Sequence, residues 1–138
     1  GIEHASLQEK LDQWIQECQG IIICPSNPYV SVDPLLKLDG VKERLAEIPA
    51  IAVSPIIGGK ALKGPAAKMM KALGISSSAE NIAEHYSALI DGFVIDEADK
   101  ESAKSIKIPT ISTNTVMLTL SDSISLAENC LGFLERFL

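Results

Sequence analysis

The sequence predicts a three-layer, Rossmann-like α/β domain with a mainly parallel sheet and helices on both faces. Short apolar runs alternate with segments whose apolar residues recur at helical spacing along the whole 138-residue chain, the pattern typical of βαβ units. The apolar runs are continuous, as in strands buried on both faces of a parallel sheet. We therefore predict one domain over residues 1–138, without internal repeats or low-complexity linkers.

The first helix is predicted over residues 7–19 and the first strand over residues 21–24. The helical segment carries its apolar residues on one face: Leu7, Leu11, Trp14, Ile15 and Cys18. We expect Trp14 to belong to the core. Gly20 ends this helix, and Pro25 ends the strand.

The second helical stretch begins at Asp33–Pro34 and is interrupted at Asp39–Gly40. Its apolar positions are Leu35, Leu38, Val41 and Leu45. Residues 50–53 form the second predicted strand, and residues 54–64 form a loop. Pro65 occupies the first position of the next helix. That helix runs to Leu73 and stops at Gly74.

Ser77 and Glu80 have the spacing of a capping box at the start of another helix. Its buried residues are predicted to be Ile82, Ala83, Tyr86 and Leu89. The next elements are a strand at 93–95, a short helix at 99–105 and a strand at 109–112. Ser121 is predicted to cap the final helix. The apolar residues expected on that helix are Ile124, Ala127, Cys130, Leu131 and Leu134.

Composition argues against several classes of function. The chain has 12 basic and 18 acidic residues and a net charge of −6, so it lacks the positive field that general nucleic-acid binding requires. No apolar run reaches the length of about 18 residues that indicates a membrane span. The start of the sequence does not resemble a secretory signal. Cys18, Cys24 and Cys130 lack metal-ligand spacing, so we expect buried, reduced thiols in a cytoplasmic protein.

Polar residues follow each predicted strand, where parallel α/β sheets bind their ligands. The segments at the four strand ends are Pro25–Pro28, Ser54–Lys60, Asp96–Asp99 and Ser112–Asn114. If all four strands are parallel, these groups converge on one rim of the sheet.

The segment from Ile48 to Ala79 contains four lysines and no acidic residue. The lysines are Lys60, Lys63, Lys68 and Lys71. Gly58, Gly59 and Gly64 precede a predicted helix start, and glycine backbone, helix N-terminus and lysine charge together suit a phosphate. A solvated loop with ordinary surface lysines is the alternative. The segment is not a Walker P-loop, because it lacks that motif's spacing.

The other strand ends each allow two interpretations. Ser26 and Asn27 suit either ligand binding or a helix-capping turn. Asp96, Glu97 and Asp99 could ligate a hard cation such as Mg²⁺, or they could cap the following helix. Capping is expected for Asp99, and Asp96 is the better ligand candidate. Thr113 and Asn114 could contact a phosphate or a base edge, or form a simple turn. The catalytic residues and the metal ligands stay unassigned.

Three long motifs, in this order, resemble the 2-phospho-L-lactate transferase family of coenzyme F420 biosynthesis. They are Pro25–Ser31 (PSNPYVS), Val53–Met70 (VSPIIGGKALKGPAAKMM) and Asp91–Asp96 (DGFVID). The resemblance extends over essentially the whole chain. It implies that the chain is the C-terminal part of a longer transferase, because family members are about twice this long.

The resemblance implies a transferase that moves a 2-phospholactyl, or phosphoenolpyruvyl, group from a guanosine diphosphate-linked donor to the deazaflavin Fo. Guanosine monophosphate leaves, and Mg²⁺ is the expected cofactor. In this interpretation Gly58, Gly59, Lys60 and Lys63 bind the donor's phosphates, and Ser26 and Asn27 hold the nucleotide. Asp96 has a supporting polar role, with Thr113 and Asn114 as weaker candidates. The family also implies a possible homodimer.

Two other functions compete with this interpretation. Gluconeogenesis factor proteins, which bind uridine diphosphate sugars without catalysis, share the general plan and a similar polar turn. Binding of a deazaflavin would distinguish the transferase from such a regulatory protein. The other alternative is a structural or dimerising domain whose polar strand ends only cap helices.

Overall fold

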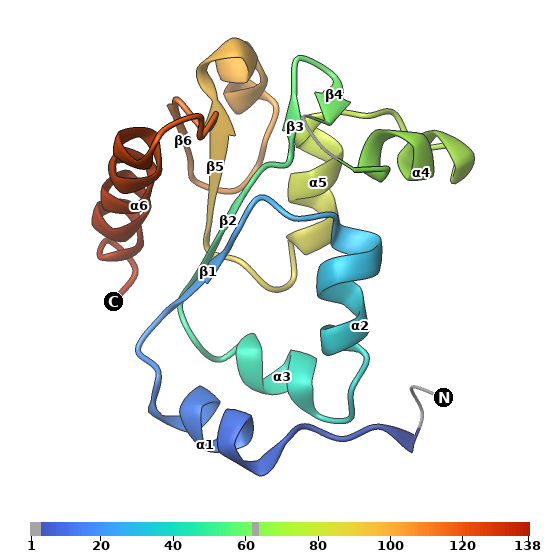
Figure 1. Ribbon diagram of the computed structural model, residues 1–138, viewed down its shortest axis with the longest axis vertical. Coiled ribbons are helices and arrows are strands. Elements are labelled where there is room, and N and C mark those ends of the chain that lie inside the picture. Colours follow the sequence, from blue (N-terminus) through green and yellow to red (C-terminus); the bar gives the residue numbers. More distant parts are fainter. Residues whose placement is uncertain (1–3, 62–63) are drawn as a thin grey trace.

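A four-stranded parallel sheet forms the centre of the computed structural model, which describes residues 4–61 and 64–138 (Figure 1). The strands are β1 (Ile21–Ile23), β2 (Ala50–Val53), β5 (Gly92–Asp96) and β6 (Thr110–Thr113). They lie in the order β1-β2-β5-β6, and every neighbouring pair is parallel. The predicted fold class is confirmed, and each strand agrees with its predicted bounds to within one residue.

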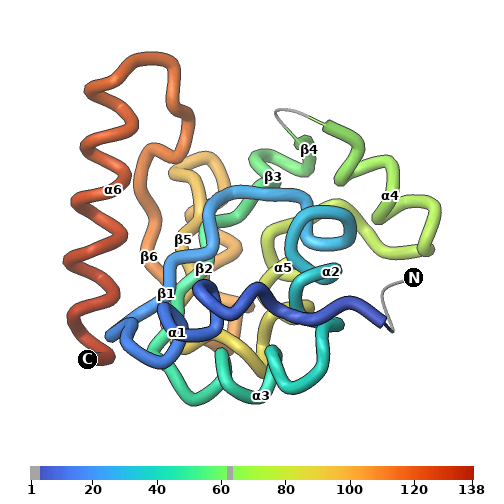
Figure 2. The backbone as a smooth tube through the Cα atoms, turned by 60° about the horizontal axis from the view of Figure 1, so that its bottom comes forward, coloured from blue at the N-terminus to red at the C-terminus, as the bar shows by residue number. Residues whose placement is uncertain are grey.

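Helices cover both faces of this sheet, which gives three layers (Figures 1 and 2). One face carries the helices of the strand-to-strand connections: α2 (Asp33–Leu36), α3 (Val41–Leu45), α4 (Ala66–Ala72) and α5 (Ala79–Tyr86). The other face carries α6 (Leu120–Leu134). Further elements are α1 (Glu9–Glu17), the π-helical turn η2 (Pro28–Val32) and the 3₁₀ helix η3 (Glu97–Lys104).

The two central strands are buried along their whole length, whereas β1 and β6 are partly exposed because they are the edges. Successive side chains of β2 enter opposite layers, as the pleat requires. Ala50 and Ala52 pack under the connecting helices, and Ile51 and Val53 pack under α6. The sheet therefore separates two hydrophobic clusters.

Several predicted helix boundaries are confirmed. Gly40 separates α2 from α3 with φ +67°, and Gly74 follows α4 with φ +73°, conformations that glycine adopts readily. Pro65 is the residue before α4 rather than its first helical residue. A salt bridge between Asp12 and Arg44 joins α1 to α3.

The predicted loop over 54–64 contains a two-stranded antiparallel hairpin. Its strands are β3 (Ile56–Ile57) and β4 (Lys60–Ala61). The two residues between them, Gly58 and Gly59, have φ of +55° and +76°. Positive φ at both central residues is what a type I′ hairpin turn requires. This turn places Lys60 next to the glycine pair.

Two predicted caps were wrong. Ser78, rather than Ser77, accepts a hydrogen bond from the Asn81 backbone at the start of α5. Thr119, rather than Ser121, caps α6, and it forms a capping box with Asp122. The true caps are the residues whose extended backbone lies directly before the first helical turn.

The prediction of a buried Trp14 was also wrong, because 58% of its surface is exposed and Lys10 lies over its ring at 5.4 Å. On α6, three residues expected in the core are exposed instead: Ile124, Ala127 and Leu131. The helix packs on the sheet through another stripe: Leu126, Cys130, Phe133 and Leu134. A second apolar stripe on the outer face of α6 explains the error.

Only one of the three predicted buried thiols is buried. Cys130 lies on the buried face of α6, whereas Cys18, directly after α1, and Cys24, directly after β1, are exposed. All three are free thiols. Within residues 4–61 and 64–138, no helix combines the length and apolarity needed to cross a bilayer.

Candidate functional site

The carboxyl ends of the parallel strands surround a cavity of about 330 Å³. Asn27 lines it from the loop after β1, and Ser54 lines it from the end of β2. Thr115 reaches it from the loop after β6. This is the rim where open α/β sheets bind ligands. The topology therefore brings together residues of two predicted polar segments, Pro25–Pro28 and Ser54–Lys60, and Thr115, which lies directly after the fourth segment.

Asn27 holds the turn after β1 in place. Its Oδ1 accepts a hydrogen bond from the Tyr29 backbone N–H at 3.0 Å, which caps η2. Its Nδ2 lies 3.4 Å from the sulfur of Met69 in α4. The side chain thus joins the turn to the helix that follows the basic hairpin.

A cluster behind this turn supports its geometry. The Tyr29 ring packs edge-to-face on His85, with centroids 5.3 Å apart. His85 Nε2 lies 2.8 Å from Asp33 Oδ1. Burial, followed by the nearby Asp33 carboxylate, raises the pKa of Tyr29. His85, to which the sequence assigned no role, therefore ties α5 to the segment that carries Asn27.

Asp96 at the end of β5 is buried, with 7% of its surface exposed, and it organises the next loop. Its Oδ1 accepts from the Ala98 backbone at 3.0 Å. Its Oδ2 accepts from the backbone and hydroxyl of Thr115 at 2.9 and 3.0 Å. Burial alone would raise the pKa of Asp96, but these hydrogen bonds outweigh it and hold the pKa below its usual value.

The prediction that Asp99 caps the following helix was wrong, since Asp96 performs that role for η3. The Asp99 carboxylate instead accepts from the Gly58 backbone N–H, with its two oxygens at 2.9 and 3.1 Å. This contact fastens the basic hairpin to the segment after β5. It also means that the Gly58 N–H already has a partner.

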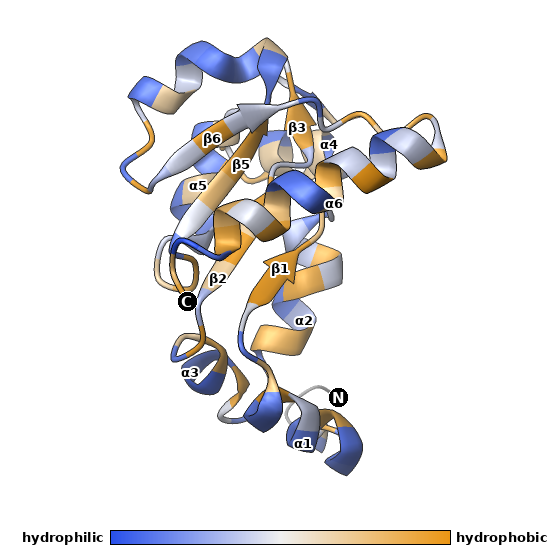
Figure 3. Ribbon diagram, turned by 90° about the vertical axis from the view of Figure 1, so that its left-hand side faces the viewer, coloured by the Kyte–Doolittle hydropathy of each residue, from blue (hydrophilic) through white to orange (hydrophobic). Residues whose placement is uncertain are grey.

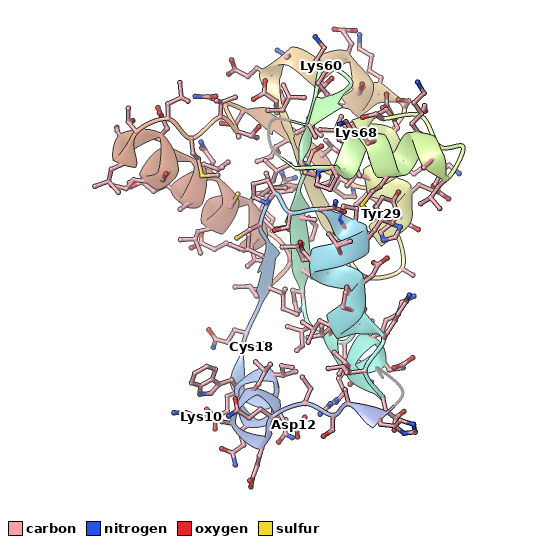
Figure 4. All side chains as sticks on the ribbon, turned by 45° about the vertical axis from the view of Figure 1, so that its right-hand side comes forward. Lys10, Asp12, Cys18, Tyr29, Lys60 and Lys68 are labelled. Atoms are coloured by element: carbon pink, nitrogen blue, oxygen red, sulfur yellow. The ribbon has the colours of Figure 1, made fainter. Side chains whose placement is uncertain are left out.

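Lys60 lies on β4 and Lys68 on α4, and both side chains are exposed near the same end of the sheet (Figure 4). Lys63 lies outside the described residues. Gly58 and Gly59 form the tip of the hairpin, whose residue Ile57 lines the cavity. The hairpin therefore carries the basic sequence next to the wall of the cavity.

The remaining predicted residues lie on the same rim with local partners. Ser26 is partly buried in the turn before Asn27. The Thr113 hydroxyl accepts a hydrogen bond from Asn129 of α6 at 3.1 Å. Asn114 Oδ1 accepts from the Val116 backbone at 3.1 Å. Their ligand-binding roles stay predictions.

Sequence reasoning missed several residues that line the cavity. Thr115 follows the predicted Asn114 directly, and it is 3% exposed. Ser54 follows β2, is 1% exposed, and exchanges two hydrogen bonds with the Ile56 backbone that begin the hairpin. Met117 and Leu118 add exposed apolar surface, with 45% and 86% of their surfaces open. Extending the segment after the fourth strand by a few residues would have found Thr115, Met117 and Leu118. Ser54 already lay in the predicted segment Ser54–Lys60, but no role was assigned to it.

The arrangement suits a ligand with a flat apolar part and an anionic part. The cavity walls are largely apolar, with Pro25, Pro55 and Ile57 among them. The adjoining hairpin and α4 contribute lysine charge. Pockets with apolar walls and a few fixed polar groups are typical small-molecule sites, and lysines act as point charges for phosphates.

Two of the rim carboxylates, Asp96 and Asp99, are engaged by hydrogen bonds from the protein. Both oxygens of each carboxylate accept such a bond. Across the part of the chain that the structure describes, no three His, Cys, Asp or Glu side chains gather as a metal site.

Comparison with known proteins places these observations in a family. Residues 1–124 match the family described as 2-phospho-L-lactate transferase CofD. The chain is 45% identical over 125 residues to a 2-phospho-L-lactate transferase of Methanocaldococcus jannaschii, covering 91% of this chain and 40% of the relative. A protein of the same name from Methanosarcina barkeri is 36% identical over 138 residues, covering 98% and 45%. The chain thus spans less than half the length of these curated relatives.

Proposed function

The chain belongs to the 2-phospho-L-lactate transferase CofD family, and from this premise we propose that the complete protein makes a phospholactyl-deazaflavin. It transfers a 2-phospholactyl, or phosphoenolpyruvyl, group from a guanosine diphosphate-linked donor to the deazaflavin Fo. A ribityl hydroxyl of Fo forms the new P–O bond and loses its proton. The bond between the donor's two phosphates breaks, and guanosine monophosphate leaves.

The observation that carries this proposal is the position of the cavity in a chain of this family. It lies at the carboxyl ends of the strands, between the Pro25–Pro28 turn and the basic hairpin. Catalysis of phosphoryl transfer consists mainly of positioning and charge stabilisation. Apolar walls that hold a ring and lysines that neutralise phosphates would supply both.

Within this chain we assign the donor nucleotide to the cavity. Its ring lies against the apolar wall, and Asn27 and Ser26 fix its orientation. Lys60 and Lys63 neutralise the phosphates, with Gly58 and Gly59 shaping the turn that presents Lys60. Asp96 acts indirectly, because its hydrogen bonds hold Thr115 against the cavity.

Mg²⁺ would stabilise the negative charge of the transferred group. Asp96 and Asp99 already accept hydrogen bonds from the protein, so we assign neither of them as its ligand.

The regulatory alternative, a protein that binds uridine diphosphate sugars, predicts a different ligand preference. We propose to titrate the complete protein calorimetrically with guanosine diphosphate, with and without Mg²⁺, and with uridine diphosphate as the control. The transferase proposal predicts guanine-selective binding together with binding of Fo. Selective binding of uridine diphosphate without Fo binding would favour the regulatory alternative.

A double substitution tests the phosphate assignment in the same titration. Lys60→Ala with Lys63→Ala removes two cations and should weaken guanosine diphosphate binding at least about tenfold, or about 1.4 kcal/mol. The matched control is Lys10→Ala with Lys42→Ala, because α1 and α3 lie at the opposite end of the sheet (Figure 1). Equal affinity of the two double variants would refute the assignment.

A further inference from the structure

The turn that carries Asn27 has a rare backbone conformation. Residues Pro28–Val32 form the π-helical turn η2, in which the Asp33 N–H donates to Pro28 O five residues earlier. Such turns are uncommon and occur frequently at functional sites, and a single helical turn has little stability of its own. Asn27 caps this turn and also lines the cavity. The position of one cavity residue therefore depends on the contacts that hold η2.

A side chain of α5 contacts both the turn and the residue at its end. His85 Nε2 lies 2.8 Å from Oδ1 of Asp33, the residue that follows η2. Because a carboxylate can only accept hydrogen bonds, His85 Nε2 carries the proton and donates. The His85 ring also packs edge-to-face against Tyr29 of η2, with centroids 5.3 Å apart (Figure 4). His85 thus contacts η2 at two points.

The helix that presents His85 is packed firmly on the sheet. Ile82 and Tyr86 are 0% and 2% exposed, and both belong to the core cluster that includes Phe93 of β5. Figure 3 shows the central strands of this sheet, β2 and β5, as largely hydrophobic. The Tyr86 ring packs edge-to-face against His85, with centroids 5.1 Å apart. His85 therefore contacts the turn from a helix that the core holds in place.

The pair formed by His85 and Asp33 lies at the surface rather than in the core. Their side chains are 26% and 20% exposed. Pairs that solvent reaches contribute little to the overall stability of a protein. Loss of His85 should therefore disturb the turn more than it weakens the fold, which separates a positioning role from a purely structural one.

We propose that His85 is a positioning residue: through Asp33 and Tyr29 it holds η2, and with it Asn27, in the conformation that the ligand of the cavity requires. His85 is not among the described residues that line the cavity, so it acts through the turn. If only a fraction of the molecules has the competent turn, the apparent affinity falls by that fraction. The inference rests on the proposed function in taking the donor nucleotide as this ligand.

The first experiment follows the turn itself, in the complete protein without ligand. Asn27 Nδ2 lies 3.4 Å from the sulfur of Met69, so the NMR resonance of the Met69 methyl group, assigned through Met69→Leu, reports on the position of Asn27. His85→Ala should shift this resonance. Ile82→Val, which removes one buried methyl group from the same helix, is the matched control and should leave it unchanged. An unchanged resonance in His85→Ala, or an equal shift in Ile82→Val, would overturn the proposal.

Calorimetric titration of the complete protein with guanosine diphosphate gives the functional readout. His85→Ala should weaken binding about tenfold, as expected if about one molecule in ten keeps the competent turn, and Ile82→Val should bind like wild type. His85→Gln offers an amide N–H to Asp33 in place of the Nε2–H and should recover part of the lost affinity. Affinity of His85→Ala equal to that of Ile82→Val, or no recovery in His85→Gln, would overturn the proposal.

The inference and the proposed function fail in different ways. If the wild type does not bind guanosine diphosphate, the nucleotide assignment of the proposed function fails, and the Met69 resonance still decides the role of His85. If guanosine diphosphate binds equally well to wild type and His85→Ala, the positioning role fails and the proposed function stands.

Discussion

Replacing Asp96 with asparagine tests whether a buried carboxylate organises the cavity wall. The carboxylate accepts three hydrogen bonds: one from the Ala98 backbone and two from Thr115. Asparagine has nearly the same shape, but one of its two terminal groups can only donate. It therefore loses either the Ala98 bond or the bond from the Thr115 backbone, and in the second case the Thr115 hydroxyl must turn to accept instead of donate.

The expected loss of stability follows from this count. Hydrogen bonds to a charged group contribute about 1.5–3 kcal/mol each. The loss of one or two of them, partly relieved by rearrangement, should lower the free energy of unfolding by roughly 2–4 kcal/mol. Thr115 also lines the cavity, so affinity for guanosine diphosphate should fall as well.

The pH dependence gives this prediction a specific sign. The pKa of folded Asp96 lies below its ordinary value, so the carboxylate stabilises the fold above the unfolded-state pKa of about 3.9. That contribution disappears as pH falls through the folded pKa. The stability difference between wild type and Asp96→Asn should therefore be full at neutral pH and should shrink below about pH 4.

Urea unfolding of the complete protein at several pH values measures both effects. Asp39→Asn is the matched control, because Asp39 is exposed and none of the side-chain hydrogen bonds in the described structure involves it. A loss at neutral pH no larger than that of Asp39→Asn would refute the reasoning. So would a difference that stays constant down to acid pH.

Three further predictions concern packing and reactivity. Gly92→Ala should lower the free energy of unfolding by about 1–3 kcal/mol, because its Cβ would lie 2.6 Å from the Phe133 ring; unchanged denaturation would contradict this close packing. Ser54→Ala should cost about 1–3 kcal/mol in the same assay, since it leaves two buried backbone groups of the hairpin unpaired; a loss within a few tenths would show that the hydroxyl is dispensable. Burial raises the pKa of the Cys130 thiol to about 11, so iodoacetamide should modify exposed Cys24 well before Cys130 when followed by mass spectrometry; equal rates would contradict the burial of Cys130.

The strands could be predicted from the sequence because their signals are local. β1, β2 and β5 contain continuous apolar runs, and β6, with the sequence Thr-Ile-Ser-Thr, follows Pro109; all four strands were found. Their parallel arrangement followed from the same pattern. The hairpin inside the predicted loop was missed, since its strands have two residues each. The adjacent glycines Gly58 and Gly59 could have indicated it, because a glycine pair readily adopts the positive φ angles of a type I′ hairpin turn.

The errors at the rim arose where a contact depends on residues far apart in the sequence. Asp99 accepts a hydrogen bond from the Gly58 backbone, and Asp96 accepts one from the Thr115 backbone. The spacing of neighbouring residues in the sequence does not predict either pair. The helix α6 misled the prediction because it has two apolar stripes, and only one of them packs on the sheet. The rim was predictable from the strand-end rule, whereas the partners of each side chain required the fold.

The central claim is that the complete protein joins a phospholactyl group to Fo. The most direct measurement is incubation with Fo, Mg²⁺ and the guanosine diphosphate-linked phospholactate donor, followed by mass spectrometry. The proposed function predicts a phospholactyl adduct of Fo and guanosine monophosphate in equal amounts. Folded protein that leaves donor and Fo unchanged, or that releases guanosine monophosphate without forming the adduct, would contradict it.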